Sequence, residues 1–472
     1  MSPFSATDAA YLQPLKYAPQ AESFLWMDST GDAWSPVDQT CHPPHDHSRG
    51  SLMHVIITAI GSAGDVHPFV GIGRTLAARG HRITFCASAV FAPVIERCGF
   101  KFLPLGTREE YQAVMADPAL WHPRTSLPTL WKTVGGTLRE QYRLLEQACD
   151  DDTVMLGSLW AFSARLLQEK HGIPLVTGQV TPFAIWSPLA RPTHPPGANL
   201  PAFVPYPLRR LLLGVIEHAF LDRLMKPELN GFRRELGLPP VKRIISQWIS
   251  SPDRVLGLFP DWFARIQQDW PAQTVLTGFP LFDESGFEEP DAELEDFLSV
   301  APPVVFTPGS TTVNAEQYFA AAAQALKLID RRGVFLTSQP VDPALSSDGR
   351  ILVRRYVPMS RILPHTSALV HHGGVGTTAL AIAAGVPQII TPFAHDHFDN
   401  AARMQSLGCG LRIFSPASAE SLATALDKVL NSHDVRASCD RYSKLMPSGE
   451  SAREAAALQV EALARTATYR VA

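Results

Sequence analysis

Two glycine-rich motifs carry the residues of this sequence that are best suited to chemistry. The first reads Gly-Ser-Ala-Gly-Asp-Val-His-Pro over residues 61–68 and follows an apolar run directly, so Asp65 falls where a strand passes into a helix. Side chains at such a junction face the ligand cleft of a parallel sheet, which makes Asp65 a candidate general base. A role as helix N-cap, in which the carboxylate accepts backbone N–H groups, explains the same position equally well.

The second motif reads His-His-Gly-Gly-Val-Gly-Thr-Thr over residues 371–378 and joins an apolar strand to an alanine-rich helix. Small residues let backbone N–H groups approach an anion, and the dipole of the following helix favours negative charge. No Walker lysine follows, which excludes a P-loop. We interpret the motif as a diphosphate site that needs neither lysine nor metal, and a turn of small residues that serves packing alone is the alternative.

Two further segments contain ligand-type side chains. His395, Asp396, His397 and Asp399 precede a predicted helix and are placed to bond the hydroxyls of a sugar. A metal cluster is disfavoured there, because adjacent side chains point in different directions, and N-capping by Asp399 is a further alternative. The Cys-His-Pro-Pro-His-Asp-His stretch at 41–47 is interpreted as solvated tail, since structural zinc sites need a folded scaffold.

The elements that must position these motifs follow an α/β rhythm. From residue 53 onward, short apolar runs alternate with helical stretches, which is typical of βα units and parallel sheets. We predict two doubly wound, Rossmann-like domains that face a central cleft. The predicted organisation is a flexible N-terminal tail (1–52), an N-terminal domain (53–278), an acidic interdomain linker (279–302), a C-terminal domain (303–446) and a C-terminal helix (447–472) that packs back across the body.

Composition excludes several classes of function. The chain has 472 residues, 41 Lys and Arg against 45 Asp and Glu, and a net charge of −4, which gives no electrostatic reason to bind nucleic acid. The six cysteines form no CxxC pair, so reduced thiols and a cytoplasmic location are expected. Neither a transmembrane run nor a secretory signal is recognisable.

Proline is concentrated in one apolar segment. Of the 40 prolines, eight lie between residues 182 and 207, interleaved with aromatic side chains. A long apolar loop of this kind is typical of a pocket for a greasy ligand, and a packed, irregular core segment is the alternative. Residues 208–216 combine two arginines with apolar residues, which is compatible with peripheral contact to the inner membrane or with a buried helix that has a cationic edge.

The two motifs, in this order and at this separation, resemble those of the family 1 nucleotide-sugar glycosyltransferases, which have the GT-B fold. The resemblance runs from about residue 53 to about residue 463. The opening motif looks like that of the sterol and antibiotic glycosyltransferases. Segments such as Gly-Ser-Leu-Trp-Ala at 157–161 and Thr-Gly-Phe-Pro-Leu-Phe-Asp at 277–283 are similar to the rhamnosyltransferases of bacterial rhamnolipid synthesis.

The family resemblance implies an inverting transfer without metal or cofactor, with the acceptor on the N-terminal domain and the nucleotide sugar on the C-terminal domain. The closer resemblance implies dTDP-L-rhamnose as donor, 3-(3-hydroxyalkanoyloxy)alkanoate as lipid acceptor and mono-rhamnolipid as product. It also implies functional coupling to the acyltransferase that makes this acceptor.

Family roles carry over to named positions. Asp65 matches the general base. The positions that match donor-binding residues are Ser310, Thr311, Val357, His372, Gly374, Gly376, Thr377, Asp396 and His397. The acceptor-binding candidates are Phe69, Trp160, Phe183, Trp186 and Arg191, with Arg209 or Arg210 as other cations for an acidic acceptor.

Two departures from the family and one rival residue leave alternatives open. Ser158 stands near where plant members have an Asp that pairs with the base, so no dyad is expected, and His397 stands where the family usually has Gln. His67 is a rival base, but on a helix it would point about 200° away from Asp65, so only one of the two should face the ligand. The alternative functions are a UDP-glucose-dependent transferase for a sterol, macrolide or other apolar alcohol, a non-catalytic activator, and a GT-B epimerase.

Overall fold

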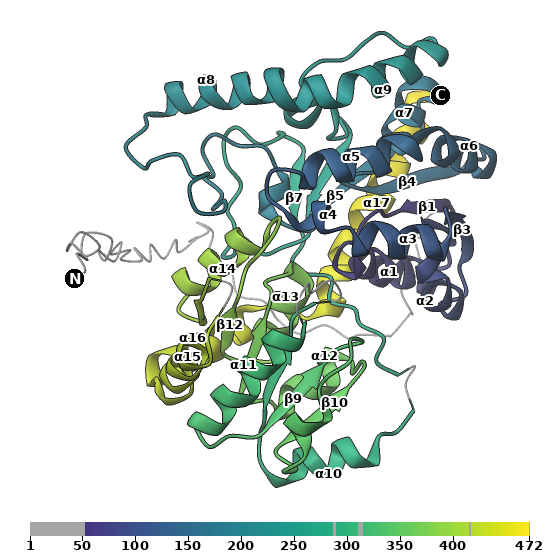
Figure 1. Ribbon diagram of the computed structural model, residues 1–472. Coiled ribbons are helices and arrows are strands. Elements are labelled where there is room, and N and C mark those ends of the chain that lie inside the picture. Colours follow the sequence, from purple (N-terminus) through teal and green to yellow (C-terminus); the bar gives the residue numbers. More distant parts are fainter. Residues whose placement is uncertain (1–51, 287–288, 310–314, 415–416, 472) are drawn as a thin grey trace, which may run out of the picture. The chain divides into compact units, whose positions relative to one another are not determined.

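Two parallel β-sheets organise the described part of the chain, which comprises residues 52–286, 289–309, 315–414 and 417–471 of a computed structural model (Figure 1). The predicted tail up to residue 51, with its Cys-His segment, lies outside the described residues, and so do Ser310 and Thr311. Both sheets lie within one compact unit, Ser51–Ala472.

The first sheet has the strand order β3-β2-β1-β4-β5-β6-β7, and every neighbouring pair is parallel. Its strands are β1 (His54–Thr58), β2 (Arg82–Ser88), β3 (Lys101–Leu105), β4 (Thr153–Ser158), β5 (Leu175–Gln179), β6 (Arg254–Gly257) and β7 (Thr274–Leu276). The central strands β1 and β4 are buried along their whole length, as expected for a sheet covered on both faces. The order reverses between β1 and β4, so the loops after these strands border the switch point where such sheets bind ligands.

The second sheet repeats this plan with the order β10-β9-β8-β11-β12-β13, again parallel throughout. Its strands are β8 (Val304–Thr307), β9 (Gly333–Leu336), β10 (Ile351–Arg354), β11 (Ala368–His371), β12 (Gln388–Ile390) and β13 (Gly410–Arg412). Here the switch point lies between β8 and β11, and the second glycine-rich motif follows β11. The predicted α/β class with two Rossmann-like sheets is confirmed.

Helices cover both sheets (Figure 1). On the first sheet they are α1 (Ala63–Ala78), α2 (Ala92–Arg97), α3 (Arg108–Ala116), α4 (Pro118–Trp121), α5 (Ser126–Gly136), α6 (Leu138–Ala148), α7 (Phe162–His171), α8 (Tyr206–Ile216), η4 (Glu217–Leu221), α9 (Asp222–Glu235) and η5 (Ile244–Trp248). The chain continues with α10 (Ala292–Val300), α11 (Ala315–Leu328), α12 (Met359–Ile362), α13 (Val375–Ala383), α14 (His397–Ser406), α15 (Ala419–Asn431), α16 (His433–Leu445) and α17 (Gly449–Val471). Helix α1 begins at Ala63, so Pro68 of the first motif lies inside it.

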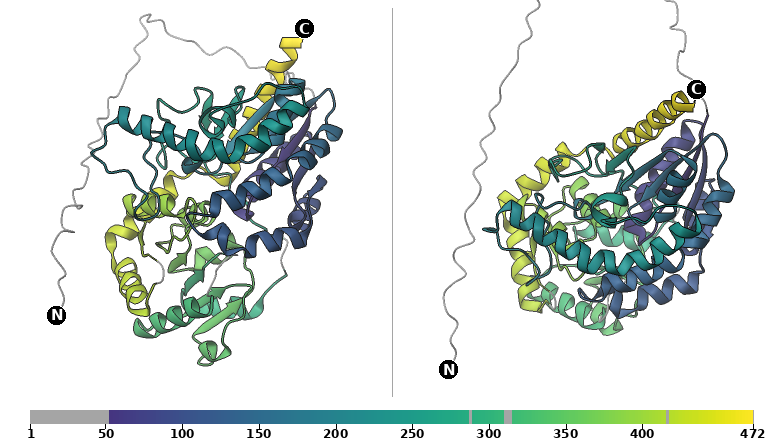
Figure 2. Two further views of the ribbon diagram at one scale, coloured as in Figure 1. Left: turned by 45° about the horizontal axis from the view of Figure 1, so that its top comes forward. Right: turned by 90° about the horizontal axis from the view of Figure 1, so that it is seen from above.

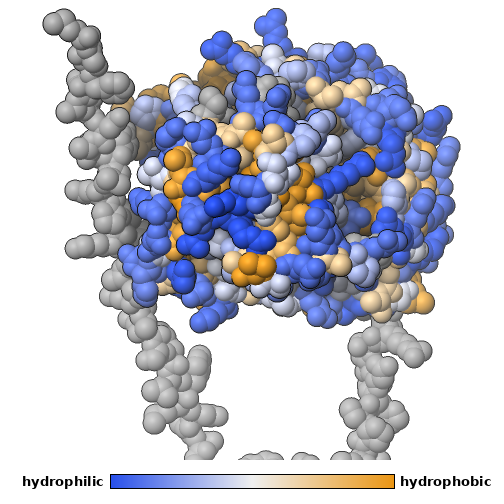
Figure 3. Space-filling view, turned by 60° about the horizontal axis from the view of Figure 1, so that its bottom comes forward, coloured by the Kyte–Doolittle hydropathy of each residue, from blue (hydrophilic) through white to orange (hydrophobic). Residues whose placement is uncertain are grey.

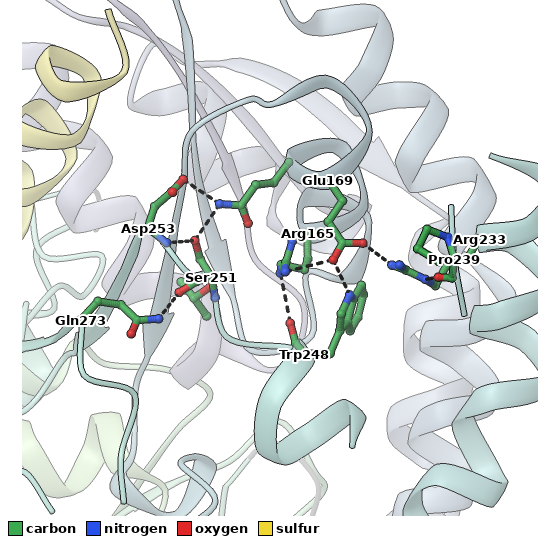
Figure 4. A network of polar contacts seen from close by, with 10 residues as sticks. Arg165, Glu169, Arg233, Pro239, Trp248, Ser251, Asp253 and Gln273 are labelled. Atoms are coloured by element: carbon green, nitrogen blue, oxygen red, sulfur yellow. Dashed lines mark hydrogen bonds and ion pairs between the residues drawn. The ribbon is translucent and has the colours of Figure 1, made fainter. Parts of the chain in front are cut away.

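A polar network holds the end of η5 against the first sheet (Figure 4). Glu169 accepts the indole N–H of Trp248 at 3.0 Å, and Arg165 donates to the Trp248 carbonyl at 3.1 Å. Arg233 of α9 pairs with the same Glu169 and donates to the Pro239 carbonyl at 2.7 Å. Because these groups are largely buried and satisfied, the network fixes the excursion from α8 to η5 on the sheet.

The C-terminal helix α17 packs on α1 and on the edges of β4, β5 and β6. Its Glu461, only 6% exposed, accepts Arg79 Nε at 2.6 Å, Arg79 Nη2 at 2.8 Å and His81 Nε2 at 2.9 Å. The Arg79 hydrogen bonds are the main reason that the pKa of Glu461 falls to about 2.

Replacing Glu461 by Ala should lower the free energy of unfolding by about 3 kcal/mol, because it leaves His81 and part of Arg79 without a buried partner. Urea unfolding curves measure the effect. Glu454 also pairs with Arg79 at 2.5 Å but is exposed, so Glu454→Ala is the matched control, with an expected loss of at most about 1 kcal/mol. Equal losses in the two variants would contradict the assignment of Glu461 as the anchor of α17.

Candidate active site

A cavity of 1030 Å³ lies between the carboxyl ends of the two sheets. On the first sheet its wall includes Asp65, which follows β1, and Ser158, the last residue of β4. On the second sheet it includes Thr307, the last residue of β8, and His372, which follows β11. These are the switch-point loops of both sheets, which is where doubly wound folds bind ligands.

The two glycine-rich motifs face each other across this cavity. Helices α1 and α13 contact one another, and a Cβ placed on Gly376 would lie 3.7 Å from the Cα of Gly64. Both helix N-termini therefore point into the same space, where their unpaired N–H groups and dipoles favour an anion. This convergence places the candidate base beside the candidate diphosphate site.

Asp65 completes the start of α1 without being its N-cap. The N-cap is Ser62, and Asp65 Oδ2 accepts the Ser62 backbone N–H at 2.8 Å and the Ser62 hydroxyl at 3.0 Å. Within the described residues both bonds go to Oδ2, which leaves Oδ1 for a ligand. Desolvation raises the pKa of Asp65 above its ordinary value, although the Ser62 bonds oppose the shift. A raised pKa makes the carboxylate a better base for an alcohol.

Gly61 makes this arrangement sterically possible. Its φ is +138°, a conformation that favours glycine, and a Cβ there would lie only 2.4 Å from Asp65 Oδ2. The motif therefore needs glycine at residue 61 so that the carboxylate can fold back over the turn.

His67 also lines the cavity, so both rival bases border it. His67 packs edge-on against Phe282 at 5.7 Å and Phe91 at 6.4 Å. Burial lowers its pKa to about 4, although the charge of Asp283 opposes the shift. His67 is thus a neutral, packed ring with little basicity.

The candidate diphosphate side of the cavity is built around His372. A Cβ on Gly374 would lie 2.6 Å from its Nε2, and one on Gly309 would lie 2.9 Å from its Nδ1, so glycines on both sides make room for the ring. Burial lowers the pKa of His372 to about 4, which leaves the imidazole neutral. Gly374, Gly376 and Thr377 line the cavity at the start of α13, and buried Val357 lines it farther along.

The predicted sugar-binding pair, Asp396 and His397, is joined to the His372 loop by a residue that the sequence did not reveal as functional. The amide of Asn400, fully buried, donates to the Gly373 carbonyl and to Asp396 Oδ2, both at 2.8 Å. Asn400 follows Asp396 by four residues, a spacing that brings two side chains together on a helix and was the available signal. His397 stacks edge-on to His372 at 4.8 Å. Asp396 and His397 both line the cavity, and Asn400 holds the Asp396 carboxylate in place.

Burial, reinforced by the charge of Asp65, raises the pKa of Asp396 to about 7. As pH rises, the unfolded chain releases this proton at a lower pH than the folded chain does. The free energy of unfolding therefore decreases between about pH 4 and pH 7. Asp396→Asn cannot titrate, so its free energy of unfolding lacks this decrease. The free energy of unfolding of the variant relative to wild type should therefore increase across that window by on the order of 2 kcal/mol. Denaturant unfolding at pH 5 and pH 8 measures it. A difference that does not change with pH would contradict the buried carboxylate, and Asp261→Asn, at an exposed site, is the control.

Four of the five predicted acceptor residues line the cavity, namely Trp160, Phe183, Trp186 and Arg191. Phe69 does not: it is fully buried in the core, and its ring lies 2.8 Å from the position of a Cβ on Gly178 of β5. The helical spacing of the apolar residues of α1 was the signal for this packing role.

The three candidate cations for an acidic acceptor have different surroundings. Arg209 lines the cavity but is buried and donates to the Val204 carbonyl at 3.2 Å and to the Pro188 carbonyl at 2.7 Å, so it braces the proline-rich loop. Arg210 is exposed and is not part of the cavity wall. Arg191 is exposed and lines the cavity, so it is the best placed of the three.

Helices α4 and α5 supply part of the wall that the sequence analysis did not assign. Leu127, Leu130 and Val134 of α5 line the cavity at helical spacing, which was the signal that could have found them. Trp121 packs edge-on to His395 at 5.4 Å, and the Ser126 hydroxyl lies 3.3 Å from His395 Nδ1. These contacts tie the N-terminal domain to the loop that carries Asp396. Among the described side chains, no group of three or more His, Cys, Asp or Glu residues is arranged to hold a metal ion.

Comparisons with known proteins identify the family. The model of the glycosyltransferase family 28 N-terminal domain matches residues 55–185, and that of the erythromycin biosynthesis protein CIII-like C-terminal domain matches residues 344–462. The chain is 32% identical to an O-mycaminosyltylonolide 6-deoxyallosyltransferase of Streptomyces fradiae over 76% of this chain and 85% of the relative. It is 28% identical to a sterol 3-beta-glucosyltransferase of Debaryomyces hansenii over 78% of this chain, which spans 24% of that longer protein.

Solved structures share the fold. The glycotransferase of kitacinnamycin superposes with a TM-score of 0.66 at 19% identity and covers 87% of this chain and 99% of its own. The glycosyltransferase SsfS6 of Streptomyces sp. SF2575, complexed with thymidine diphosphate, superposes with a TM-score of 0.55 at 19% identity over 85% of this chain and 98% of its own. The two facing motifs, the matching family models and the relatives in sequence lead to one conclusion. The chain belongs to the GT-B nucleotide-sugar glycosyltransferases of family 1.

Proposed function

We propose that this glycosyltransferase moves L-rhamnose from dTDP-L-rhamnose to the hydroxyl group of a 3-(3-hydroxyalkanoyloxy)alkanoate, which gives a mono-rhamnolipid. The observation that carries the proposal is the acceptor half of the cavity, where Trp160, Phe183, Trp186 and the leucines of α5 surround one exposed cation, Arg191. An apolar chain that ends in a carboxylate matches this combination of surfaces. An acyltransferase that joins two hydroxyacyl chains would supply such an acceptor.

Two similar proteins support a deoxysugar on a thymidine nucleotide as the donor. The name of the Streptomyces fradiae relative specifies transfer of a 6-deoxyhexose, the chemical class of rhamnose, and SsfS6 was solved with thymidine diphosphate. In this chain the nucleotide would lie along Val357, and its diphosphate would lie at the N-terminus of α13 beside His372 and Thr377.

The mechanism follows from the facing helices. Asp65 Oδ1 takes the proton of the acceptor hydroxyl as that oxygen attacks the anomeric carbon. The new C–O bond forms on the face opposite the diphosphate, so the anomeric centre inverts as its bond to the diphosphate breaks. The N–H groups at the start of α13 and the hydroxyl of Thr377 donate hydrogen bonds to the phosphate oxygens of the leaving nucleoside diphosphate. These hydrogen bonds stabilise the negative charge that it gains. Asp396, held by Asn400, accepts a hydrogen bond from a hydroxyl of the sugar.

The test is incubation of the full chain with dTDP-L-rhamnose and a hydroxyalkanoyloxyalkanoate, followed by mass spectrometry of the lipid. UDP-glucose, and a macrolide or sterol acceptor, form the other arms of the experiment. We expect a rhamnosylated lipid only from the first donor and acceptor. Turnover of UDP-glucose on another apolar alcohol, with no rhamnosylated lipid, would replace the proposal by the second candidate, which the name of the Debaryomyces hansenii relative favours.

Arg191→Ala tests the acidic end of the acceptor. The variant should raise the acceptor KM by about tenfold and leave the donor KM unchanged, because a charged hydrogen bond contributes about 1.5–3 kcal/mol. The methyl ester of the acceptor is the matched control. Because it lacks the carboxylate, its KM should be the same for wild type and variant. An unchanged KM for the free acid would remove Arg191 from the site.

A further inference from the structure

Helix α8 and the short helix η4 that continues it carry a stripe of apolar side chains on the outside of the protein. Five large apolar residues are exposed there: Leu208 (44%), Leu211 (62%), Val215 (53%), Ile216 (39%) and Phe220 (68%). Phe203 (86%) is exposed just before α8. Figure 2 shows α8 and α9 as one long helical run on the outer surface. On the face shown in Figure 3, by contrast, hydrophilic side chains break the apolar surface into patches.

The charges in the first part of this helical run, residues 206–223, are segregated. The two acids of this part point inward: Glu217 accepts the Ser246 backbone N–H at 2.8 Å, and Asp222 pairs with Lys226 at 2.6 Å. Both are almost fully buried, at 3% and 1% exposure. Arg210 and Arg223 are exposed and form no ion pair within the described part of the chain. The surface from 206 to 223 therefore presents apolar and cationic groups and no exposed acid.

The same helical run forms part of the cavity wall. Leu213, Ile216 and Leu221 line the cavity beside the proline-rich loop, and Ile216 is also exposed on the outer stripe. The outer stripe and the acceptor half of the cavity are thus joined around one helix. A lipid tail moving along α8 would meet apolar side chains from the surface to the cavity.

We propose that α8 and η4 dock on an anionic lipid surface, with Leu211, Val215 and Phe220 inserted among the acyl chains and Arg210 and Arg223 against the headgroups. An amphipathic helix with an apolar stripe and exposed cations lies in the interface in this way. A protein partner, or a second copy of the chain, that covered this stripe would need acidic groups opposite the two arginines. The purpose of docking rests on the proposed lipid acceptor, but the docking itself does not require any substrate.

The test is flotation of the full chain with vesicles that contain no donor or acceptor, so its failure is distinguishable from failure of the proposed function. We expect binding to mixed phosphatidylglycerol–phosphatidylcholine vesicles, and weaker binding to phosphatidylcholine alone or at high salt. The double variant L211E/V215E should bind at least about tenfold more weakly, because two acids replace the centre of the stripe. Neither residue lines the cavity.

The matched control is Leu328→Glu, which places the same charge at a leucine of α11 that is 57% exposed. It should float like wild type, and circular dichroism should show all three proteins equally folded. Wild type that fails to float with the anionic vesicles would overturn the proposal, as would a double variant that floats as well as wild type. Light scattering in solution tests whether a second copy of the chain covers the stripe instead. If wild type forms a dimer that L211E/V215E abolishes, and wild type does not bind vesicles, the stripe is an interface between two copies.

Discussion

Asp65→Asn is expected to lower turnover by roughly 10²–10⁴-fold while donor affinity stays within about twofold of wild type. The amide is nearly isosteric and its oxygen still accepts the two hydrogen bonds from Ser62, but it cannot take a proton from the acceptor hydroxyl. Single-turnover rates at saturating donor measure the chemical step. Calorimetric titration with the nucleoside diphosphate measures donor-site integrity.

His67→Phe is the matched control for this variant. His67 contacts Phe91 and Phe282 as a neutral ring, so a phenyl ring should fill the same space and turnover should fall by no more than about threefold. If the two results were exchanged, with His67→Phe inactive and Asp65→Asn near wild type, the base would be His67.

The second large effect is expected from Gly374→Ala, which should weaken donor binding by about 10–100-fold. The added methyl group would lie 2.6 Å from Nε2 of His372, so the imidazole must leave its place beside the diphosphate site. Gly374 is the N-cap of α13 with φ −59°, a conformation open to alanine, so the free energy of unfolding should change by only about 1 kcal/mol. Titration of the nucleoside diphosphate and a urea unfolding curve separate the two effects.

Gly136→Ala provides the comparison at a glycine outside the site. Gly136 ends α5, and a Cβ there would meet no atom within 4 Å, so donor affinity should be unchanged. Donor binding by Gly374→Ala that equals that of Gly136→Ala would show that the position of His372 does not matter for the diphosphate.

The central strands and the two glycine motifs were predictable because their signals are local. Buried apolar runs form the strands β1, β4, β8 and β11. The glycines of each motif predict a turn from a strand into a helix. The strands β3, β6, β7 and β13 carry weaker local signals: they have three to five residues each, and β3 contains Pro104, as an edge strand can. Their pairing depends on a neighbouring strand far away in sequence, which no local pattern reveals.

The candidate site divides in the same way. Asp65 was correctly placed at a helix start, but the choice of Ser62 as N-cap follows from backbone geometry that spacing does not specify. Phe69 was predicted to bind the acceptor, yet it lies on the buried apolar face of α1 and packs in the core. Arg209 was a candidate cation until its two backbone carbonyl partners identified it as a brace.

The sequence by itself determined the α/β class, the two turns that bear the motifs and the residue types that we expect to meet a nucleotide sugar. Only the tertiary structure decided that the N-termini of α1 and α13 converge, that Asn400 joins Asp396 to the Gly373 loop, and that the apolar stripe of α8 faces outward. The physical reason is the range of the forces involved. Turns and helix starts are set within a few residues, whereas convergence and exposure depend on packing between segments that lie far apart in the chain.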